Sequence, residues 1–450
     1  MTTPDPAARL PGVPTTTTLP PDAAERRTLH DEVHARPTAR IRLPALVLQV
    51  AVVNEGVTLD SELEHLRRLP GQRGLLREQL APHFLRLRLP GGTLKWERHT
   101  EVTRYSLVQP LPDDSVHGAS DPELLAALII EHGWLGRIPG RTLAAIELVL
   151  LAGSPEEVAA PLERARHWFG DRTVVASLVG RNGHSSVVTD FRLRANGWER
   201  MLVIAPPDTG ETRVGRLAAR LLEIETYRLL ALRGLPVAKS LQPMLREAEQ
   251  AVADVTSSME NQDRSDADLL ETLAAVAARV ERATALHSYR FCATEAYDAL
   301  VRARIAELRE QPFPGTQTLG EFLQRRLAPA MATVDSAAGR LASLSQRIER
   351  AGALLRTRVD IAREAQNQQL LAKLARGQQL QLRLQSTVEG LSIAAISYYV
   401  VSLLLYAAKA AKAGGVPIQP ELAVGATIPL VLWGVWRMTR RIHDRLQHHD

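Results

Sequence analysis

The stretch LHDEVHARP, residues 29–37, is the densest group of side chains in this sequence that could bind a metal ion. Its chemically interesting members are His30, Asp31, Glu32, His34 and Arg36. On a helix, the two histidines would share one face, as they do in zinc proteases. Those enzymes place a glutamate, the general base, directly after the first histidine, whereas here Asp31 stands there. Pro37 also disfavours helix at Arg36.

Two interpretations of this motif are open. In the first, it binds a metal together with a third ligand such as His83, His99 or His117. In the second, it is a helix end whose charged groups pair with Arg36, Arg40 or another segment, as an interdomain or intersubunit contact. No third ligand is evident close by in the sequence, so we favour the second interpretation and expect no metal and no cofactor.

Other polar residues fit structural roles. In WERHTEVTRY, residues 96–105, alternation along two strands predicts one wet face and one apolar face, with Trp96 and Tyr105 in the core and a ligand site as the alternative. The only cysteine, Cys292, lies in an amphipathic helical pattern, and we expect a buried structural thiol there. A single cysteine excludes an internal disulfide and a multi-cysteine zinc site.

Fingerprints of common enzymes are not found. GRNGHS, residues 180–185, is too short for a phosphate loop, and Asn182-Gly183 fits a tight hairpin turn between two strands. We find no Walker-type lysine loop, nucleophile elbow or dinucleotide fingerprint. The expectation is therefore a protein that is not an enzyme, and a metalloenzyme is the alternative only if the histidine motif binds metal.

Composition indicates a folded chain rich in helix. Of the 450 residues, 45% are hydrophobic and only 4% aromatic, and this length allows two or three domains. The 55 basic residues exceed the 50 acidic ones by too little to indicate nucleic-acid binding, and no recognition module accompanies them. We therefore expect no nucleic-acid partner.

The elements that must position these residues change in kind along the chain. Residues 1–22, rich in Thr and Pro, predict a disordered leader without a secretory signal. Residues 23–208 predict a mixed α/β domain with strands at 43–53 and around 84–96 and a helix at 59–69. Further helices are expected at 121–132 and 155–169, between additional apolar strands.

Residues 209–388 predict a long helical stalk. Its first helix should end at Gly234 and Pro236. Spacings of three and four predict a coiled-coil seam, formed by Leu341, Leu344, Ile348, Ala351 and Leu355. A stutter then moves the seam to Val359 and Ala362. Packing within one subunit and self-association both explain this pattern.

Residues 389–438 predict a transmembrane hairpin. Residues 390–408 carry no charge and approach the roughly 20 residues that a spanning helix needs. A second apolar run covers 422–438, after a short loop containing Gly and Pro. Basic residues concentrate before the first span and in the tail 439–450, so both long ends should lie in the cytoplasm. The prediction is a multi-pass membrane protein with its long ends in the cytoplasm.

A small or polar face follows the first span. Its members share one side of the helix at spacings of three and four: Ser392, Ala395, Tyr399, Ser402, Tyr406 and Lys409. Because polar groups avoid lipid, this stripe should meet the second span, a neighbouring subunit or a water-filled path. A helix-packing seam and a pore lining are both open.

Several separated motifs resemble one family of bacterial proteins, which carries a domain of unknown function and is predicted to be membrane-anchored. The motifs are LHDEVHARP, KWERHTEVTRYSL, LLEIETYRLLALRGLP, HSYRFCATEAYDALV and SIAAISYYVVSLLLY. The resemblance runs from about residue 24 to the C-terminus and implies a membrane location. It implies no activity and no catalytic residues.

The architecture also resembles the CorA superfamily of magnesium channels, which are pentamers with a pore lined by the first span. Their Gly-Met-Asn signature follows a tyrosine, but here Tyr406 is followed by Ala-Ala-Lys. A ring of Lys409 would repel divalent cations.

The expected fold is thus α+β with a CorA-like architecture. The expected function is an oligomeric scaffold or sensor in the lipid bilayer, a homopentamer if CorA-like, with an ion channel of altered selectivity as the alternative.

Overall fold

The computed structural model describes residues 22–26, 29–30, 39–111, 128–153, 168–170, 172–415 and 419–446. The chain divides into two compact units. The first, the sheet unit, comprises residues 1–254 and 273–348. The second, the hairpin unit, comprises residues 255–272 and 349–450.

Nine strands of the described residues form one sheet, in the order β2-β3-β4-β1-β5-β8-β7-β6-β9. The strands are β1 (Ala45–Val53), β2 (Phe84–Leu89), β3 (Gly92–Arg98), β4 (Val102–Pro110), β5 (Arg141–Ala152), β6 (Val175–Val179), β7 (Ser185–Thr189), β8 (Glu199–Ala205) and β9 (Gln311–Pro312). All neighbours pair antiparallel except β5 and β8, which are parallel. The mixed α/β fold predicted from the apolar runs is confirmed.

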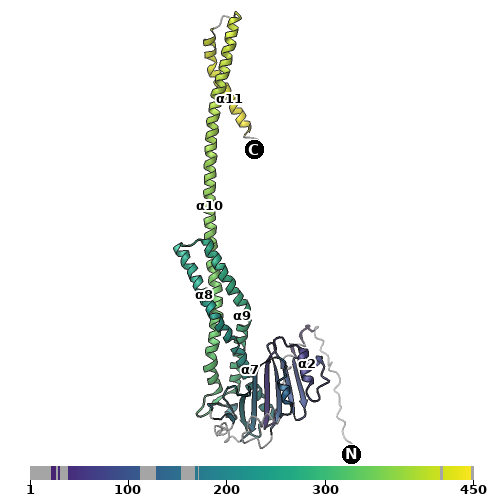
Figure 1. Ribbon diagram of the computed structural model, residues 1–450. Helices are drawn as coiled ribbons and strands as arrows, with labels where there is room; N and C mark the ends of the chain where they lie inside the picture. Colours follow the sequence, from purple (N-terminus) through teal and green to yellow (C-terminus); the bar gives the residue numbers. More distant parts are fainter. Residues whose placement is uncertain are drawn as a thin grey trace, which may run out of the picture. The chain divides into compact units, whose positions relative to one another are not determined.

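The helices and helical turns are α2 (Leu59–Arg67), η1 (Arg77–Leu80), α4 (His132–Leu135), η3 (Arg181–Gly183), α7 (Glu211–Leu232), α8 (Gly234–Asn261), α9 (Asp266–Leu308), α10 (Leu319–Ala413) and α11 (Pro420–Leu446). Figure 1 labels the longer of these helices. The first long helix ends at Leu232, and α8 begins at once with Pro236 in its first turn. The expected helices at 121–132 and 155–169 lie almost wholly outside the described residues.

The sheet is covered on both faces, because its strands alternate between two apolar cores. On β1, Leu46 and Leu48 belong to one core, with residues of α2. Val47 and Ala51 belong to the other core, with residues of α7, α9 and the start of α10. Burial on both faces explains why the central strands are almost continuously apolar.

The expectation of a solvent-exposed face on the β3–β4 hairpin is wrong, because a helix covers that face. On β2, Arg86 and Arg88 are exposed. On the next two strands, however, Glu97 and Arg104 are buried. The sequence pattern could not reveal that α7, which lies far along the chain, would cover these charges.

Helix α7 approaches the segment before β1 very closely. The Ile41 N–H donates to the carbonyl of Glu211 at 3.1 Å. A Cβ atom added at Gly215 would lie 1.7 Å from the carbonyl oxygen of Ala39. Glycine is therefore required at this point of contact.

In the bundle part of the sheet unit, ion pairs join α8 to its neighbours. Arg279 of α9 pairs with Glu247 at 2.7 Å, and Arg340 of α10 pairs with Glu249 at 2.7 Å. The predicted seam is buried from Leu341 to Leu355, whereas Val359 is half-buried and Ala362 exposed. Whether the exposed residues 361–388 meet a second copy stays a prediction.

Within the described residues, two helices are long and apolar enough to cross a membrane: α10, and α11 over Pro420–Thr439. Only 6% of the most apolar window of each is buried. Their apolar side chains therefore face outward, as in a membrane helix, and are not packed as in a core helix. The two helices contain the spans predicted at 390–408 and 422–438 and favour membrane association.

Candidate functional site

The histidine motif falls mostly outside the described residues. His30 is exposed, but Asp31, Glu32, His34 and Arg36 lie in the part of the chain that the structure does not describe, as does His117. Among the described residues, no group of three or more His, Cys, Asp or Glu side chains could hold a metal ion. The interpretation of this motif stays a prediction.

The small and polar stripe of α10 is mostly exposed within this chain. Ser402 is half-buried, and the other five members are exposed. The hydroxyls of Ser392 and Ser402 donate to the carbonyls four residues earlier, each at 2.8 Å. These two serines therefore need no partner from another helix. In the described part of the hairpin, the buried residues are Ser397, Pro420 and Val424, all outside the stripe.

The expectation of a buried Cys292 is wrong, because the thiol is exposed on α9. Around Cys292, the buried positions of this helix are the neighbouring Phe291, Thr294 about one turn after it and Asp298 about two turns after it. Cys292 lies one residue beyond that buried row. The predicted hairpin turn at Asn182-Gly183 is confirmed, because it joins the antiparallel strands β6 and β7 and both residues have positive φ.

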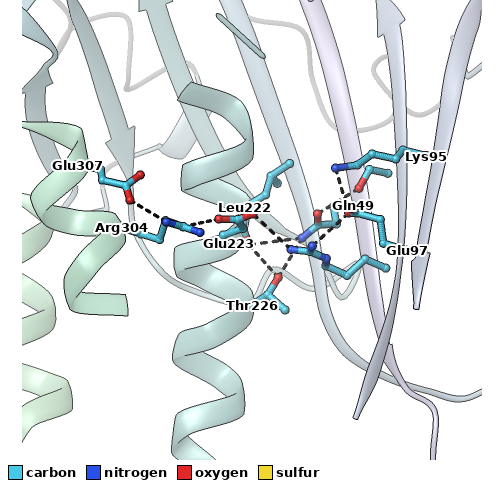
Figure 2. Close-up of polar contacts among 10 residues, drawn as sticks. Gln49, Lys95, Glu97, Leu222, Glu223, Thr226, Arg304 and Glu307 are labelled. Atoms are coloured by element: carbon cyan, nitrogen blue, oxygen red, sulfur yellow. Dashed lines mark hydrogen bonds and ion pairs between the residues drawn. The ribbon is translucent and has the colours of Figure 1, made fainter. Parts of the chain in front are cut away.

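A chain of ion pairs connects the sheet to the helices that cover it (Figure 2). On β3, Lys95 pairs with Glu97 at 2.9 Å, and Glu97 pairs with Arg104 of β4 at 3.2 Å. Arg104 lies 4.0 Å from Glu223 of α7. Glu223 pairs with Arg304 of α9, which also pairs with Glu307 at 2.7 Å. We call these residues, together with Arg220, which pairs with Glu307, the ion-pair chain.

Buried members of the ion-pair chain have shifted pKa values. Burial lowers the pKa of Lys95 despite the nearby Glu97. Burial alone would raise the pKa of Glu97, but the positive charges of Arg104 and Lys95 outweigh it and lower that pKa. The pair therefore stays ionised because its members compensate one another. Removing one member would leave a buried charge unpaired.

Neutral hydrogen bonds surround the middle of the ion-pair chain. The Gln49 amide donates to the Thr226 hydroxyl at 3.0 Å, and the Ser106 hydroxyl donates to the Gln49 carbonyl oxygen at 3.1 Å. The Thr226 hydroxyl donates to the carbonyl of Leu222 at 2.8 Å. These bonds fix α7 against β1 and β4, as Figure 2 shows.

At its outer end the ion-pair chain reaches a cavity. Glu307 accepts a hydrogen bond from Arg220 of α7 at 2.9 Å. Both residues line a pocket of about 470 Å³, which we call the arginine pocket. Its other lining residues are Val179, Gly180, Arg181, Ser185, Val203, Ala205, Thr209, Arg213, Val214, Arg216, Leu217, Leu308 and Arg309. Of the described residues, five arginines and a single carboxylate thus surround this cavity.

Three elements bring these arginines together. Arg213, Arg216 and Arg220 follow one another on one face of α7, at spacings of three and four. Arg181 comes from the β6–β7 turn, and Arg309 follows the last residue of α9. The Gly180 N–H donates to the carbonyl of Leu308 at 2.8 Å, which joins the turn to the end of α9.

Most of these guanidinium groups have no acidic partner. Among the described residues, no carboxylate lies within ion-pair distance of Arg181, Arg213, Arg216 or Arg309, and all four are exposed. Single exposed arginines are usually just solvated, but here four converge on one cavity. Such an arrangement attracts anions, since each guanidinium can donate two hydrogen bonds to an oxyanion.

A second set of buried charged residues lies between β8 and α7. Glu199 of β8 and Glu225 of α7 are both buried, and Arg228 pairs with both carboxylates. Burial and the neighbouring Glu225 raise the pKa of Glu199 to about 9. Burial alone would raise the pKa of Glu225, but Arg228 and a hydrogen bond from Glu199 lower it. The opposite pKa shifts favour one proton shared by this pair, held on the Glu199 side.

On the opposite face of the sheet, several buried polar side chains lie beside aromatic rings. The His65 ring stacks on Trp134 with ring centroids 4.1 Å apart, and Arg98 pairs with Glu62 at 2.7 Å. Burial lowers the pKa of His65 to about 4, so this ring is neutral. The group packs as part of the core, and we assign it no ligand.

Among the comparisons with known proteins, a family model gave a match. A family model described as "Protein of unknown function (DUF3422)" matches residues 21–446. The chain belongs to this family. No curated protein and no solved structure matched the chain. The matched range of the family includes every strand and helix of both units, so the arginine pocket and the hairpin belong to one family domain.

Proposed function

We propose that this protein is a membrane-anchored sensor that binds a small anion in the arginine pocket. The observation that carries the proposal is the convergence on one cavity of about 470 Å³ of four arginines that have no acidic partner among the described residues. Ligand pockets of small molecules have volumes of roughly 300–1,000 Å³. The same chain carries two outward-facing apolar helices that suit a membrane anchor.

The ion-pair chain supports a sensing role. Glu307 and Arg220 line the pocket, and the ion pairs continue from them to Lys95 of β3, near one edge of the sheet. An anion that attracts Arg220 competes with Glu307 for it, and the change reaches the buried pairs through Arg304. Such coupling requires two arrangements of a contiguous network that the ligand favours differently.

Assembly is part of the same proposal. The helix surface at 361–388 and the stripe residues Tyr399, Tyr406 and Lys409 are exposed in one chain, and a second copy would cover them. We propose a homo-oligomer in the bacterial inner membrane, with both termini in the cytoplasm. A pentamer and an ion path along the stripe, as in CorA channels, stay predictions.

Thermal unfolding of the full chain in mild detergent tests the sensor. Sulfate, phosphate and citrate are compared with chloride at equal ionic strength. We expect at least one multivalent anion to raise the midpoint by several degrees, because a ligand at 100 times its Kd stabilises the folded state by about 2.7 kcal/mol.

Two double variants give this experiment its specificity. Arg213→Gln with Arg216→Gln should abolish the anion effect. Arg325→Gln with Arg326→Gln removes the same charge from exposed positions of α10 outside the pocket and should preserve it. If no multivalent anion stabilises the wild type more than chloride does, the proposed function is wrong.

A further inference from the structure

The composition of the arginine pocket narrows the class of its ligand. Five arginines and one glutamate leave an excess of four positive charges around a single cavity. Glu307 is already paired with Arg220 and Arg304. A ligand with one negative charge would leave most of this excess uncompensated. A functional group that carries two negative charges would compensate more of this positive charge.

The pocket also has an apolar part. Six of its lining residues are aliphatic: Val179, Val203, Ala205, Val214, Leu217 and Leu308. Five of the six are buried and form the wall of the pocket, and Leu217 is half-buried. A bare inorganic ion would fill only a small fraction of about 470 Å³. An organic portion attached to the anionic group would occupy more of this volume and would contact Leu217 and the apolar stems of the arginines.

Local geometry also favours an anionic group at the α7 end of the pocket. The pocket reaches the first turn of α7, where Thr209 and Arg213 line it and where the Gly210 cap provides no side-chain acceptor for the helix N–H groups. The positive end of the helix dipole adds to the arginine charges there. A Cβ atom added at Gly180 would lie 3.6 Å from a guanidinium nitrogen of Arg213, so this side chain lies over the turn that carries Arg181.

We propose that the arginine pocket binds an organic phosphomonoester of roughly nucleotide size. Arg213, Arg216 and Arg181 bind the phosphate oxygens, and the half-buried Leu217 and the apolar stems of the arginines contact the organic portion. A phosphomonoester carries about −1.5 to −2 charges at pH 7 and three acceptor oxygens, which matches the excess of forked donors. This inference rests on the proposed function, because it names the ligand class of the same site.

Two sources can supply this chemistry. One is a soluble sugar phosphate or nucleotide, and the other is the phosphomonoester headgroup of a lipid such as phosphatidic acid. The experiment therefore uses both. Titration calorimetry on the full chain in detergent uses adenosine 5′-monophosphate and glucose 6-phosphate as probes, with adenosine, glucose, inorganic phosphate and citrate beside them. Flotation with vesicles that contain phosphatidic acid or only neutral lipid gives the second arm.

We expect at least one phosphomonoester probe to bind at least tenfold more tightly than its phosphate-free partner and than inorganic phosphate. Arg213→Gln with Arg216→Gln should weaken that binding at least tenfold. Arg181→Gln, from a separate element, should weaken it as well. Arg213→Lys keeps the charge without the fork and should retain part of the affinity. The control pair at Arg325 and Arg326 should stay within twofold of the wild type.

Other outcomes separate the two proposals. Stabilisation by citrate without binding of any phosphomonoester, soluble or lipid, overturns the ligand class and leaves the sensor intact. Equal binding of adenosine and its monophosphate, or equal affinity in the wild type and the double variant, also overturns it. Binding only to phosphatidic acid vesicles, lost in the double variant, supports the phosphomonoester class and assigns it to the membrane lipid.

Discussion

At the scale of single residues, the most unusual pair is Glu199 and Glu225, two carboxyl groups buried under α7 with one arginine. Two ionised carboxylates that interact in a buried site would repel one another, which favours the retention of one proton by the pair. The pKa of Glu199 is raised to about 9 from an ordinary value of 4.5. The folded chain therefore holds a proton that the unfolded chain releases at neutral pH.

This retained proton makes stability depend on pH. Between pH 4.5 and about 9, the folded state binds more protons at Glu199 than the unfolded state does, so the free energy of unfolding falls as pH rises. Glu199→Gln keeps a donor to Glu225 and cannot titrate. Thermal unfolding at roughly pH 6 and roughly pH 9 should show a smaller loss of stability in this variant than in the wild type.

Glu281→Gln is the matched control, because Glu281 is exposed on α9. Its pH profile should follow that of the wild type. If Glu199→Gln instead loses as much stability between the two pH values as the wild type does, the proton is not held at Glu199.

At the scale of elements, the close approach of α7 to the chain before β1 holds the sheet unit together. Helix α7 carries three arginines of the pocket, two residues of the ion-pair chain and Glu225. Its position depends on Gly215, where an added Cβ atom would lie 1.7 Å from the Ala39 carbonyl oxygen. Because Gly215 has no side chain, α7 can take the position that brings these residues together.

Gly215→Ala should destabilise the sheet unit and weaken anion binding together. Overpacking of this kind costs typically about 1–3 kcal/mol. In contrast, Gly339→Ala in α10 meets no atom within 4 Å and should stabilise the chain by about 0.5–1 kcal/mol through helix propensity. Denaturant unfolding of the two variants beside the wild type measures both effects. Equal stability of Gly215→Ala and the wild type would show that the contact is not close.

At the scale of the whole molecule, the single cysteine is a natural probe of topology. Cys292 is exposed in the sheet unit, and Gly414 lies just after α10 in the hairpin unit. The basic residues flanking the spans predict that the sheet unit lies in the cytoplasm and the hairpin loop outside. The two positions should therefore react from opposite sides of the membrane.

Labelling with a membrane-impermeant maleimide tests this arrangement. In intact spheroplasts the wild type should stay unlabelled and become labelled after lysis. Cys292→Ser with Gly414→Cys should be labelled in intact spheroplasts. Labelling of Cys292 from outside would reverse the proposed orientation, and protection of both positions until lysis would argue against a hairpin that crosses the membrane.

Local patterns in the sequence determined much of this protein. Alternating and continuous apolar runs predicted β1 and the β2–β3 hairpin, and helical spacing with Gly234 and Pro236 predicted the end of α7. The absence of charge over 390–408 predicted an apolar helix. These features depend on neighbours within a few residues, so composition and period suffice to identify them.

Only the tertiary structure decided what the charged residues do. Arg213, Arg216 and Arg220 can be seen as one helix face in the sequence, but Arg181 and Arg309 join them only because the β6–β7 turn bonds to the end of α9. Glu97 and Arg104 looked solvent-exposed until distant helices covered their face of the sheet. Contacts between residues a hundred or more positions apart leave no periodic trace, because each partner's own surroundings satisfy the local pattern.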